Sequence, residues 1–404
     1  MDNPIVALAG CAEYEEGAVD RALQQVLAAV GGLESLLPDQ GVVLLKPNFL
    51  VPRKVELAVT THPRFIAAVA RAVRARHRGR LLLGDGPALG SSNSVARKIG
   101  LPELLDGLDV EIVDFEERIP VTGGGGFGPL LMARPLVEAD AVISLPKVKT
   151  HGQMYFTCGV KNLFGAFVGF DKPRFHLTAG RDYATFARLL LEACRRVGPV
   201  LTLADGVVGM EGNGPSSGEP RVLGLIAGSR EPVALDSVLI DLLGFPASAV
   251  PVQMEARRQA LTGAWLEQVE LRGDPPERFR VGDWQPARQE GYVDVAGLPP
   301  ALARPMRNAL TSRPVIDHAR CTRCGLCAEQ CAAGALDLRP RRRQPAGPTG
   351  SDQSMNLDLT RCIRCYCCQE VCPERAITVG EGWLLELTHR WERLLRRMLG
   401  RVGR

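Results

Sequence analysis

Residues 42–85 read VVLLKPNFLVPRKVELAVTTHPRFIAAVARAVRARHRGRLLLGD, and this stretch decides the fold class. It opens with an apolar run, VVLLK (42–46), that has the length and composition of a buried strand. A segment at 63–77 begins with Pro63 and repeats its apolar residues at helical spacing. A second apolar run, RLLLGD (80–85), follows. The order strand, helix, strand is typical of an α/β domain.

The same alternation continues over the first 250 residues. A helical pattern occupies 183–197, YATFARLLLEACRRV, and includes Cys194, which we interpret as an ordinary buried cysteine. Further strands are expected at 110–115, 141–146, 200–205 and 223–228. We therefore predict an α/β domain over 1–250, with a mostly parallel sheet flanked by helices.

Composition narrows the class of protein. The chain has 404 residues, enough for two or three domains, with 46% hydrophobic and 23% charged residues. A formal net charge of +4 is too small to indicate nucleic-acid binding. The N-terminus lacks the pattern of a secretory signal, and no apolar run reaches the length of a spanning helix. We therefore expect a cytoplasmic protein with no nucleic-acid partner.

Cysteines are concentrated near the C-terminus. Of 12 cysteines, only Cys11, Cys158 and Cys194 precede residue 320, and the other nine lie within 321–372. In a reducing compartment such crowding indicates metal binding rather than disulfides.

Two cysteine runs share the spacing C-x2-C-x2-C-x3-C. They are CTRCGLCAEQC (321–331) and CIRCYCCQEVCP (362–373). In such runs three thiolates bind one [4Fe–4S] cluster, and the fourth binds the partner cluster. The first predicted ligand set is Cys321, Cys324, Cys327 and Cys372, and the second is Cys362, Cys365, Cys368 and Cys331. The alternative is structural zinc, which uses two CxxC pairs rather than two complete four-cysteine runs.

Residues 313–380 resemble bacterial-type ferredoxins with two clusters. Two features depart from that pattern: Ala332 stands where these ferredoxins usually have proline, and a basic insertion, RPRRRQPAGPTGSDQ (339–353), separates the runs. The insertion is either a solvated loop or a docking site for an acidic electron donor. Cys367 is a ninth cysteine, which we interpret as a spectator.

Polar residues follow four of the predicted strands. Because parallel strands end at one edge of their sheet, where ligands bind, we expect these side chains to share a site. They are Lys46, Asn48, Asp85, Lys147, Lys149, His151 and Asp205. The alternative is that loops are simply polar.

The segment LPKVKTHGQMYFTCGVKNLFG (145–165) suggests what this site binds. Lys147, Lys149 and Lys161 supply positive charge, and Gly152, Gly159 and Gly165 allow backbone amides to approach a ligand. GNGP (212–215) would add further backbone donors. A carboxylate or phosphate suits such a site. No Walker A or GxGxxG sequence is present, and TGGGGFGP (122–129) is better interpreted as a flexible turn.

These blocks also resemble a known family, catalogued as domain of unknown function 362. The resemblance spans 41–245 and rests on LLKPNF, THP, GDGP, LPKVKTHG, TCGVKNLFG, ADGVVGMEGNGP and PVALDSV, in the family's order. Members often carry a C-terminal two-cluster ferredoxin module. The resemblance implies a polar signature at Lys46, Asn48, Asp85, Lys147, Lys149, His151, Lys161, Asn162, His176, Asp205 and Asp236.

Single residues in these blocks allow more than one role. His151 and His176 are candidate proton donors, metal ligands or hydrogen-bonded loop histidines. Cys158 is a packed side chain or a reactive thiol. Lys161 and Asn162 either orient a ligand or pack at a helix start.

The C-terminal segment 382–399, GWLLELTHRWERLLRRML, is amphipathic and basic. Its Trp and Leu residues fall near one helical face. Such a helix lies on a membrane surface, binds a partner or packs on its own chain.

The whole sequence predicts an iron–sulfur redox enzyme with two [4Fe–4S] clusters. The clusters would relay electrons from a ferredoxin-like donor or acceptor protein to a small anionic substrate, with Lys147, Lys149, His151 and His176 as catalytic residues. Two alternatives remain: an electron carrier or iron–sulfur maturation factor, and a non-redox ligase or transferase with structural clusters. The expected domains are 1–250 (α/β), 251–312 (its completion and a linker), 313–380 (a small α+β ferredoxin-like domain) and 381–404 (a basic helix).

Overall fold

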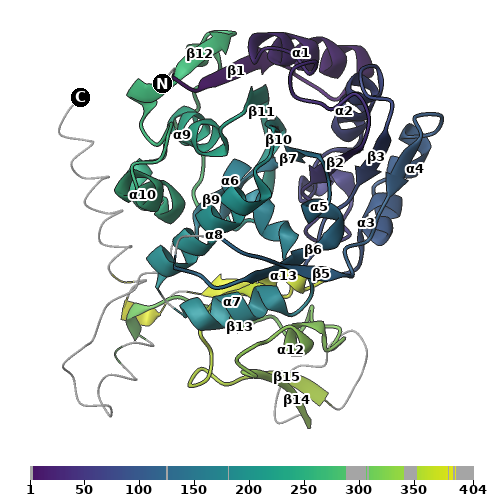
Figure 1. Cartoon of the computed structure of the whole chain (residues 1–404). Coiled ribbons are helices and arrows are strands. Elements are labelled where there is room, and N and C mark those ends of the chain that lie inside the picture. The colour runs from purple at the N-terminus through teal and green to yellow at the C-terminus, as the bar shows by residue number, and fades with distance from the viewer. Residues whose placement is uncertain are drawn as a thin grey trace, which may run out of the picture. The chain divides into compact units, whose positions relative to one another are not determined.

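The computed structural model of the chain divides into two units, residues 1–287 and residues 288–404 (Figure 1). The boundary falls within the segment 251–312, most of whose described residues belong to the first unit. The structure describes residues 3–123, 126–180, 182–287, 306, 309–340, 353–380, 382–384 and 387.

Ten strands among the described residues of unit 1 form one sheet. Eight follow the order β12-β1-β11-β10-β7-β2-β3-β4, while β8 pairs with β10 and β9 with β8. The bounds are Ile5–Gly10 (β1), Val42–Pro47 (β2), Arg80–Leu83 (β3), Val110–Ile112 (β4), Ala141–Leu145 (β7), Lys147–His151 (β8), Tyr155–Thr157 (β9), Leu201–Glu211 (β10), Glu219–Ser229 (β11) and Glu270–Gly273 (β12). The pairs β10–β7, β7–β2, β2–β3 and β3–β4 are parallel, whereas β11 runs antiparallel to β1 and β10. The predicted α/β class with a mostly parallel sheet is confirmed.

Helices cover both faces of this sheet. Val43 and Leu45 of β2 join a core shared with α1 (Glu16–Ala29) and α2 (Pro63–Arg74), whereas Leu44 joins a second core with α8 (Tyr183–Val197). Alternate residues of a strand point to opposite faces, so β2 is apolar on both. The other helices of unit 1 are α3 (Ser92–Lys98), α4 (Leu101–Leu104), α5 (Arg134–Val137), α6 (Gly159–Asn162), α7 (Asp171–Ala179), α9 (Pro232–Leu242) and α10 (Pro251–Arg258).

Helix boundaries follow local chemistry. α2 begins at Pro63, which needs no hydrogen-bond partner for its nitrogen, and the side chain of His62 caps the helix by accepting from the Arg64 N–H. In α8, the Asp182 carboxylate accepts from the Thr185 N–H, and Gly198 ends the helix in a left-handed conformation. α8 has the predicted bounds 183–197, while α2 ends three residues before the predicted 77.

Predictions of loops after two strands are wrong. Lys147, Lys149 and His151 were expected in a loop but lie on β8, because the chain stays extended after Pro146 and pairs with β10. Asp205 was expected past a strand end but lies inside β10, which runs on to Glu211. These polar side chains are therefore held on strands and buried.

The glycine-rich stretch 122–129 connects two strands of a separate hairpin. β5 (Arg118–Val121) and β6 (Leu130–Ala133) pair antiparallel on either side of it. This placement agrees with the interpretation of the stretch as a turn. The strand predicted at 110–115 is shorter, since β4 ends at Ile112.

Among its described residues, unit 2 contains two small antiparallel sheets. β13 (Arg313–Ile316) pairs with β16 (Ile377–Gly380), and β14 (Leu336–Pro340) pairs with β15 (Gln353–Leu357). Its helices include α12 (Leu326–Glu329) and α13 (Cys367–Val371). This is the α+β arrangement predicted for 313–380.

The predicted C-terminal helix lies almost entirely outside the described residues, as does most of the basic insertion. Within the described ranges, no helix combines the length and the hydropathy needed to cross a bilayer.

Candidate functional site

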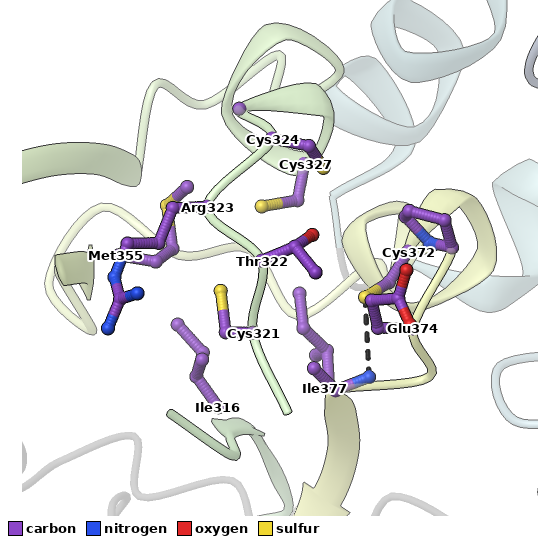
Figure 2. A pocket seen from close by; sticks show the side chains of 13 residues that line it. Ile316, Cys321, Thr322, Arg323, Cys324, Cys327, Met355, Cys372, Glu374 and Ile377 are labelled. Carbon is purple, nitrogen blue, oxygen red and sulfur yellow. Dashed lines mark hydrogen bonds between the residues drawn. The ribbon is translucent and has the colours of Figure 1, made fainter. Parts of the chain in front are cut away.

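Cysteines from both runs line one hollow of about 350 Å³ in unit 2 (Figure 2). They are Cys321, Cys324, Cys327 and Cys372. Cys321 and Cys324 lie in the loop before α12, Cys327 lies on α12, and Cys372 comes from the second run, directly after α13. This is the first predicted set.

A second hollow of about 360 Å³ has the complementary cysteines. They are Cys331, Cys362, Cys365, Cys368 and also Cys367. The fourth cysteine of each run therefore lies with the first three of the other run, as the spacing predicts.

The two cysteine runs repeat one local conformation. The N–H of Cys321 donates to the Asp317 carbonyl at 3.0 Å, and the N–H of Cys362 donates to the Asp358 carbonyl at the same distance. These turns place the first cysteine of each run against its hollow. Unit 2 is thus built from two copies of one turn, which gives two cysteine-lined hollows.

Backbone donors also reach the exchanged cysteines. The Ala335 N–H donates to Cys331 Sγ at 3.2 Å, and the Ala376 N–H donates to Cys372 Sγ at 3.3 Å, the dashed line in Figure 2. Such bonds stabilise negative charge on a sulfur ligand and tune the potential of a bound cluster.

The chemistry of these hollows fits an iron–sulfur cluster. Burial, together with the charges of Cys372, Cys321 and Cys324, raises the pKa of Cys327 to about 12. Bound cations invert this effect and hold the thiolates deprotonated. Among the described residues, no three His, Cys, Asp or Glu side chains lie close enough to hold one metal ion. Each hollow gathers cysteines from two complete four-cysteine runs, which suits a multi-iron group better than a zinc ion.

In unit 1, Lys46 and Asp85 form a buried ion pair at the carboxyl edge of the sheet. Lys46 Nζ lies 2.6 Å from Asp85 Oδ1, and both side chains are almost fully buried. Asp85 Oδ2 accepts from the Phe49 N–H. A Cβ on Gly165 would lie 2.0 Å from Asp85 Oδ1 and 2.5 Å from Lys46 Nζ, so only glycine fits over this pair.

A second network joins Lys147 to Asp205 and two residues that the sequence did not single out. Lys147 Nζ donates to Asp205 Oδ2 at 2.9 Å and to Tyr14 Oη at 2.6 Å. Tyr14 donates to Asp205 Oδ1 at 2.6 Å, and its ring stacks on His62 with centroids 3.5 Å apart. Lys147 and Asp205 are buried, whereas Tyr14 and His62 are partly exposed. Solvent therefore reaches the network through the tyrosine and the histidine.

Burial sets the protonation of this network. It raises the pKa of Tyr14 well above its ordinary value, an effect that the Asp205 charge increases. It lowers the pKa of Lys147 against the opposing effect of Asp205. Burial and the nearby charges of Lys147 and Arg64 lower the pKa of His62 to about 4, in spite of Asp205. At neutral pH, Tyr14 is a neutral hydroxyl and His62 a neutral imidazole.

Lys149 and the amide side chains of two asparagines are the remaining predicted polar groups at the carboxyl edge of the sheet. Lys149 Nζ donates to Asn48 Oδ1 at 2.6 Å and to the Val59 carbonyl at 2.8 Å. Asn162 donates to the Lys46 carbonyl and to Ser144 Oγ. Most of the predicted polar residues thus lie in buried networks at one edge of the sheet.

The predicted backbone donors are used inside the protein. The N–H groups of Gly152 and Gly214 donate to the carbonyls of Gly214 and Gly212, and the Gly159 N–H donates to Asp236 Oδ1. Gly165 is pressed against an ion pair. The expectation that glycine amides are offered to a ligand is therefore wrong for Gly152, Gly159 and Gly214.

The two candidate histidines have different surroundings. His151 Nδ1 accepts from the N–H groups of Gln153 and Met154, so its neutral form carries the proton on Nε2. His176 lies in α7 against the rings of Phe164 and Phe186. Both are buried.

Three further candidates have local structural partners. Lys161 Nζ lies 5.5 Å from the Phe164 ring centroid. The Asp236 carboxylate accepts from the N–H groups at the start of α6, and burial raises its pKa to about 7. Burial and the Asp236 charge raise the pKa of Cys158 well above its ordinary value, which agrees with a packed cysteine rather than a nucleophile.

Comparison with known proteins agrees with these features. A family model described as domain of unknown function (DUF362) matches residues 43–241, and one described as a 4Fe-4S dicluster domain matches residues 320–376. Thylakoid-associated protein sll1697 of Synechocystis sp. is 37% identical over 297 residues, which are 74% of this chain and 92% of that protein. The chain belongs to the family of domain of unknown function 362. It is also an iron–sulfur protein of the [4Fe–4S] type.

Two solved structures resemble this family member at low identity. The lactate racemase apoprotein from Thermoanaerobacterium thermosaccharolyticum has a TM-score of 0.40 and 15% identity, over 58% of this chain and 56% of that one. A protein from Thermotoga maritima has a TM-score of 0.34 and 13% identity, over 55% and 56%. The fold class rests on the sheet described above.

Tyr14 and His62 are the site residues of this family member that the sequence did not reveal. Tyr14 follows β1, a strand that was not predicted, so no strand end marked it. His62 lies in the THP block, whose Pro63 indicated only a helix start. The sequence signal that could have found Tyr14 is the apolar run IVALAG (5–10), because the strand that it forms, β1, ends at the same edge as β2 and β7.

Proposed function

We propose that the protein is an iron–sulfur oxidoreductase with two [4Fe–4S] clusters that passes electrons to a small anionic substrate at the carboxyl edge of the α/β sheet. The observation that carries the redox part is the pair of cysteine-lined hollows with exchanged fourth cysteines. When bound, the two clusters supply single electrons. A cytoplasmic location remains a prediction from cysteine usage.

Lys147, Lys149 and Tyr14 support the choice of site. An incoming carboxylate or phosphate would take hydrogen bonds from the two ammonium groups, replacing part of what Tyr14, Asp205 and Asn48 accept now. Tyr14 and His62 form the partly exposed side through which a small molecule enters. Asp205 and Asp85 limit the positive charge, so a compact anion suits the site better than a polyanion.

Tyr14 is also better placed than His176 to deliver protons. A two-electron reduction consumes two electrons and two protons. Tyr14 Oη gives up one proton and regains it from Lys147 Nζ, 2.6 Å away, whose lowered pKa makes it a stronger acid than an ordinary lysine. Solvent returns the proton to Lys147 through the partly exposed Tyr14 and His62 side of the network and supplies the second proton.

The test uses the full chain, reconstituted anaerobically, reduced and freed of excess reductant. Small carboxylates and phosphate esters are then added singly, and reoxidation is followed by the visible absorbance of the clusters. One class should reoxidise the protein. Lys147→Ala with Lys149→Ala should abolish this reaction while leaving the cluster spectrum intact, and the exposed Lys98→Ala is the control.

The double variant leaves buried acceptors without donors, so a loss of folding would also abolish the reaction. Tyr14→Phe, which removes a single hydroxyl, therefore provides a second measurement. Loss of its hydroxyl should slow reoxidation by roughly 10²-fold or more. Reoxidation only by a ferredoxin-like protein would overturn the proposal in favour of an electron carrier. If the protein turns over an anion at the same rate when it is fully oxidised, the non-redox ligase or transferase is favoured.

A further inference from the structure

A cavity in unit 1 lies at the edge of the sheet opposite the proposed substrate site. β10 runs parallel to β7, and Thr202 near its start pairs with Ser229, the last residue of β11. Pro199 and Arg230 lie just outside these two strand ends, and both line a cavity of about 990 Å³. We call it the amino-edge cavity. Its volume is that of a site for a small organic molecule.

Part of the wall of this cavity is apolar. Leu191 and Cys194 of α8 and Val233 of α9 line it, and all three side chains are almost fully buried. Leu191 and Cys194 are three residues apart, so they share one face of their helix. Burial raises the pKa of Cys194, so its thiol stays neutral and belongs to the apolar wall. Such a wall suits the hydrocarbon part of a ligand.

Two arginines that line the cavity have hydroxyl groups as partners. Arg230 donates to Ser35 Oγ at 3.0 Å, and Arg188 donates to Thr185 Oγ1. In the parts of the chain that the structure describes, neither guanidinium has a carboxylate within ion-pair distance. Their positive charges are therefore not balanced by a direct contact.

Two carboxylates also line the cavity. Glu192 is buried and pairs with Arg195 and, at 2.6 Å, with Arg196, so its charge is balanced. Glu231 directly precedes α9, and burial raises its pKa. One carboxylate thus stands against the two arginines with hydroxyl partners, and the cavity keeps a net positive charge.

A third carboxylate near the cavity does not change this balance. Glu255 feels the charge of Arg188, but the hydrogen bonds of Arg258 lower its pKa more. Arg258 contacts both carboxylate oxygens, at 2.6 and 2.8 Å. Glu255 is therefore already paired, and Arg188 remains available to a ligand.

We propose that the amino-edge cavity binds an amphipathic organic anion, whose carboxylate or phosphate head group is held by Arg188 and Arg230 and whose hydrocarbon part packs on Leu191, Cys194 and Val233. A guanidinium suits either head group, because its fork of donors makes two parallel hydrogen bonds to an oxyanion. This site does not rest on the proposed function, since the cavity shares no residue with the cysteine-lined hollows or with the lysine networks.

The test is isothermal titration calorimetry of the full reconstituted chain in its oxidised state. Octanoate and octyl phosphate are the probes, and at least one should bind saturably at one site. Tighter binding of one probe identifies the head group. Acetate lacks the hydrocarbon part and 1-octanol lacks the charge, so each should bind at least roughly 10-fold more weakly.

Variants then locate the site. Arg188→Ala and Arg230→Ala should each weaken binding of the better probe by roughly 10-fold, whereas Arg230→Lys keeps the charge and should weaken it less. Arg97→Ala is the matched control, because Arg97 is exposed on α3 and does not line the cavity. The unfolding temperature of each variant, measured without probe, separates loss of binding from loss of folding.

Three outcomes would overturn the proposal: no saturable binding of either probe, equal binding of 1-octanol, and binding that survives both arginine substitutions. The comparison of probes uses the unaltered chain, so it holds even if a variant is unstable. Should no small anion reoxidise the clusters, the calorimetry still decides the role of the cavity, because it needs no electron transfer.

Discussion

The hollows of unit 2 and the buried networks of unit 1 both contain charged or ionisable groups. The charge of these groups is balanced differently in the two units. Lys46 and Lys147 each contact a carboxylate of the same chain, so unit 1 has its counter-charges built in. Burial and the neighbouring thiols of Cys372, Cys321 and Cys324 raise the pKa of Cys327, so its thiolate is not stabilised by the polypeptide. The charges of Lys46 and Lys147 are thus balanced within the polypeptide, whereas the sulfurs of unit 2 need a metal to balance their charge.

Removal of iron should have the largest effect on the difference between the two units. Chelation of the reduced protein is expected to abolish the unfolding transition of unit 2 and to leave that of unit 1, because the free energy of metal binding is folding free energy for the unit that holds the metal. Differential scanning calorimetry with and without chelator measures both transitions. Identical traces would contradict the prediction.

Loss of one carboxylate should have the next largest effect. Asp85→Ala leaves the Lys46 ammonium buried without its partner and is expected to destabilise unit 1 by about 3–5 kcal/mol. Glu111→Ala breaks the exposed pair with Arg80 and should cost under about 1 kcal/mol. Urea unfolding of both variants provides the measurement, and equal losses would refute the distinction.

Acid should weaken unit 1 through His62. Its folded pKa of about 4 is below the ordinary 6.5, so the unfolded state binds more protons between these values and stability falls as the pH is lowered through this window. The contribution is about 3 kcal/mol between pH 7 and pH 4. His62→Gln should flatten this part of the stability–pH curve, and parallel curves would count against it.

A methyl group at Gly165 should have the smallest effect of the four. Gly165→Ala presses on the Lys46–Asp85 pair and is expected to cost about 1–3 kcal/mol. Gly282→Ala is the matched control, since a Cβ there would meet nothing within 4 Å. If the two variants unfold at the same urea concentration, the close approach at Gly165 has no energetic role.

The sequence was most informative where the chemistry is local. Each cysteine run fits within a dozen residues, so its spacing alone grouped the eight cysteines as the structure does. The order of strands and helices also predicted the sheet, because Val43, Leu44 and Leu45 are apolar towards both faces.

The rest depends on contacts between distant segments. Lys147 finds Asp205 and Tyr14 only after β8 pairs with β10 and β1 joins the sheet, so no window of sequence could show that its charge is balanced. The sequence therefore predicted lysines available to a ligand, whereas the structure has them hydrogen-bonded within the protein. The glycine amides were misjudged for the same reason.

The exchange of the fourth cysteine has a consequence for biosynthesis. The first set of four lacks its last member until Cys372 has left the ribosome, although three of its members are made before residue 330. The second set is finished only a few residues earlier, at Cys368. A nascent chain that stops between the two runs has no complete set of four, so both sets are completed only when the second run is made, within a few residues of each other.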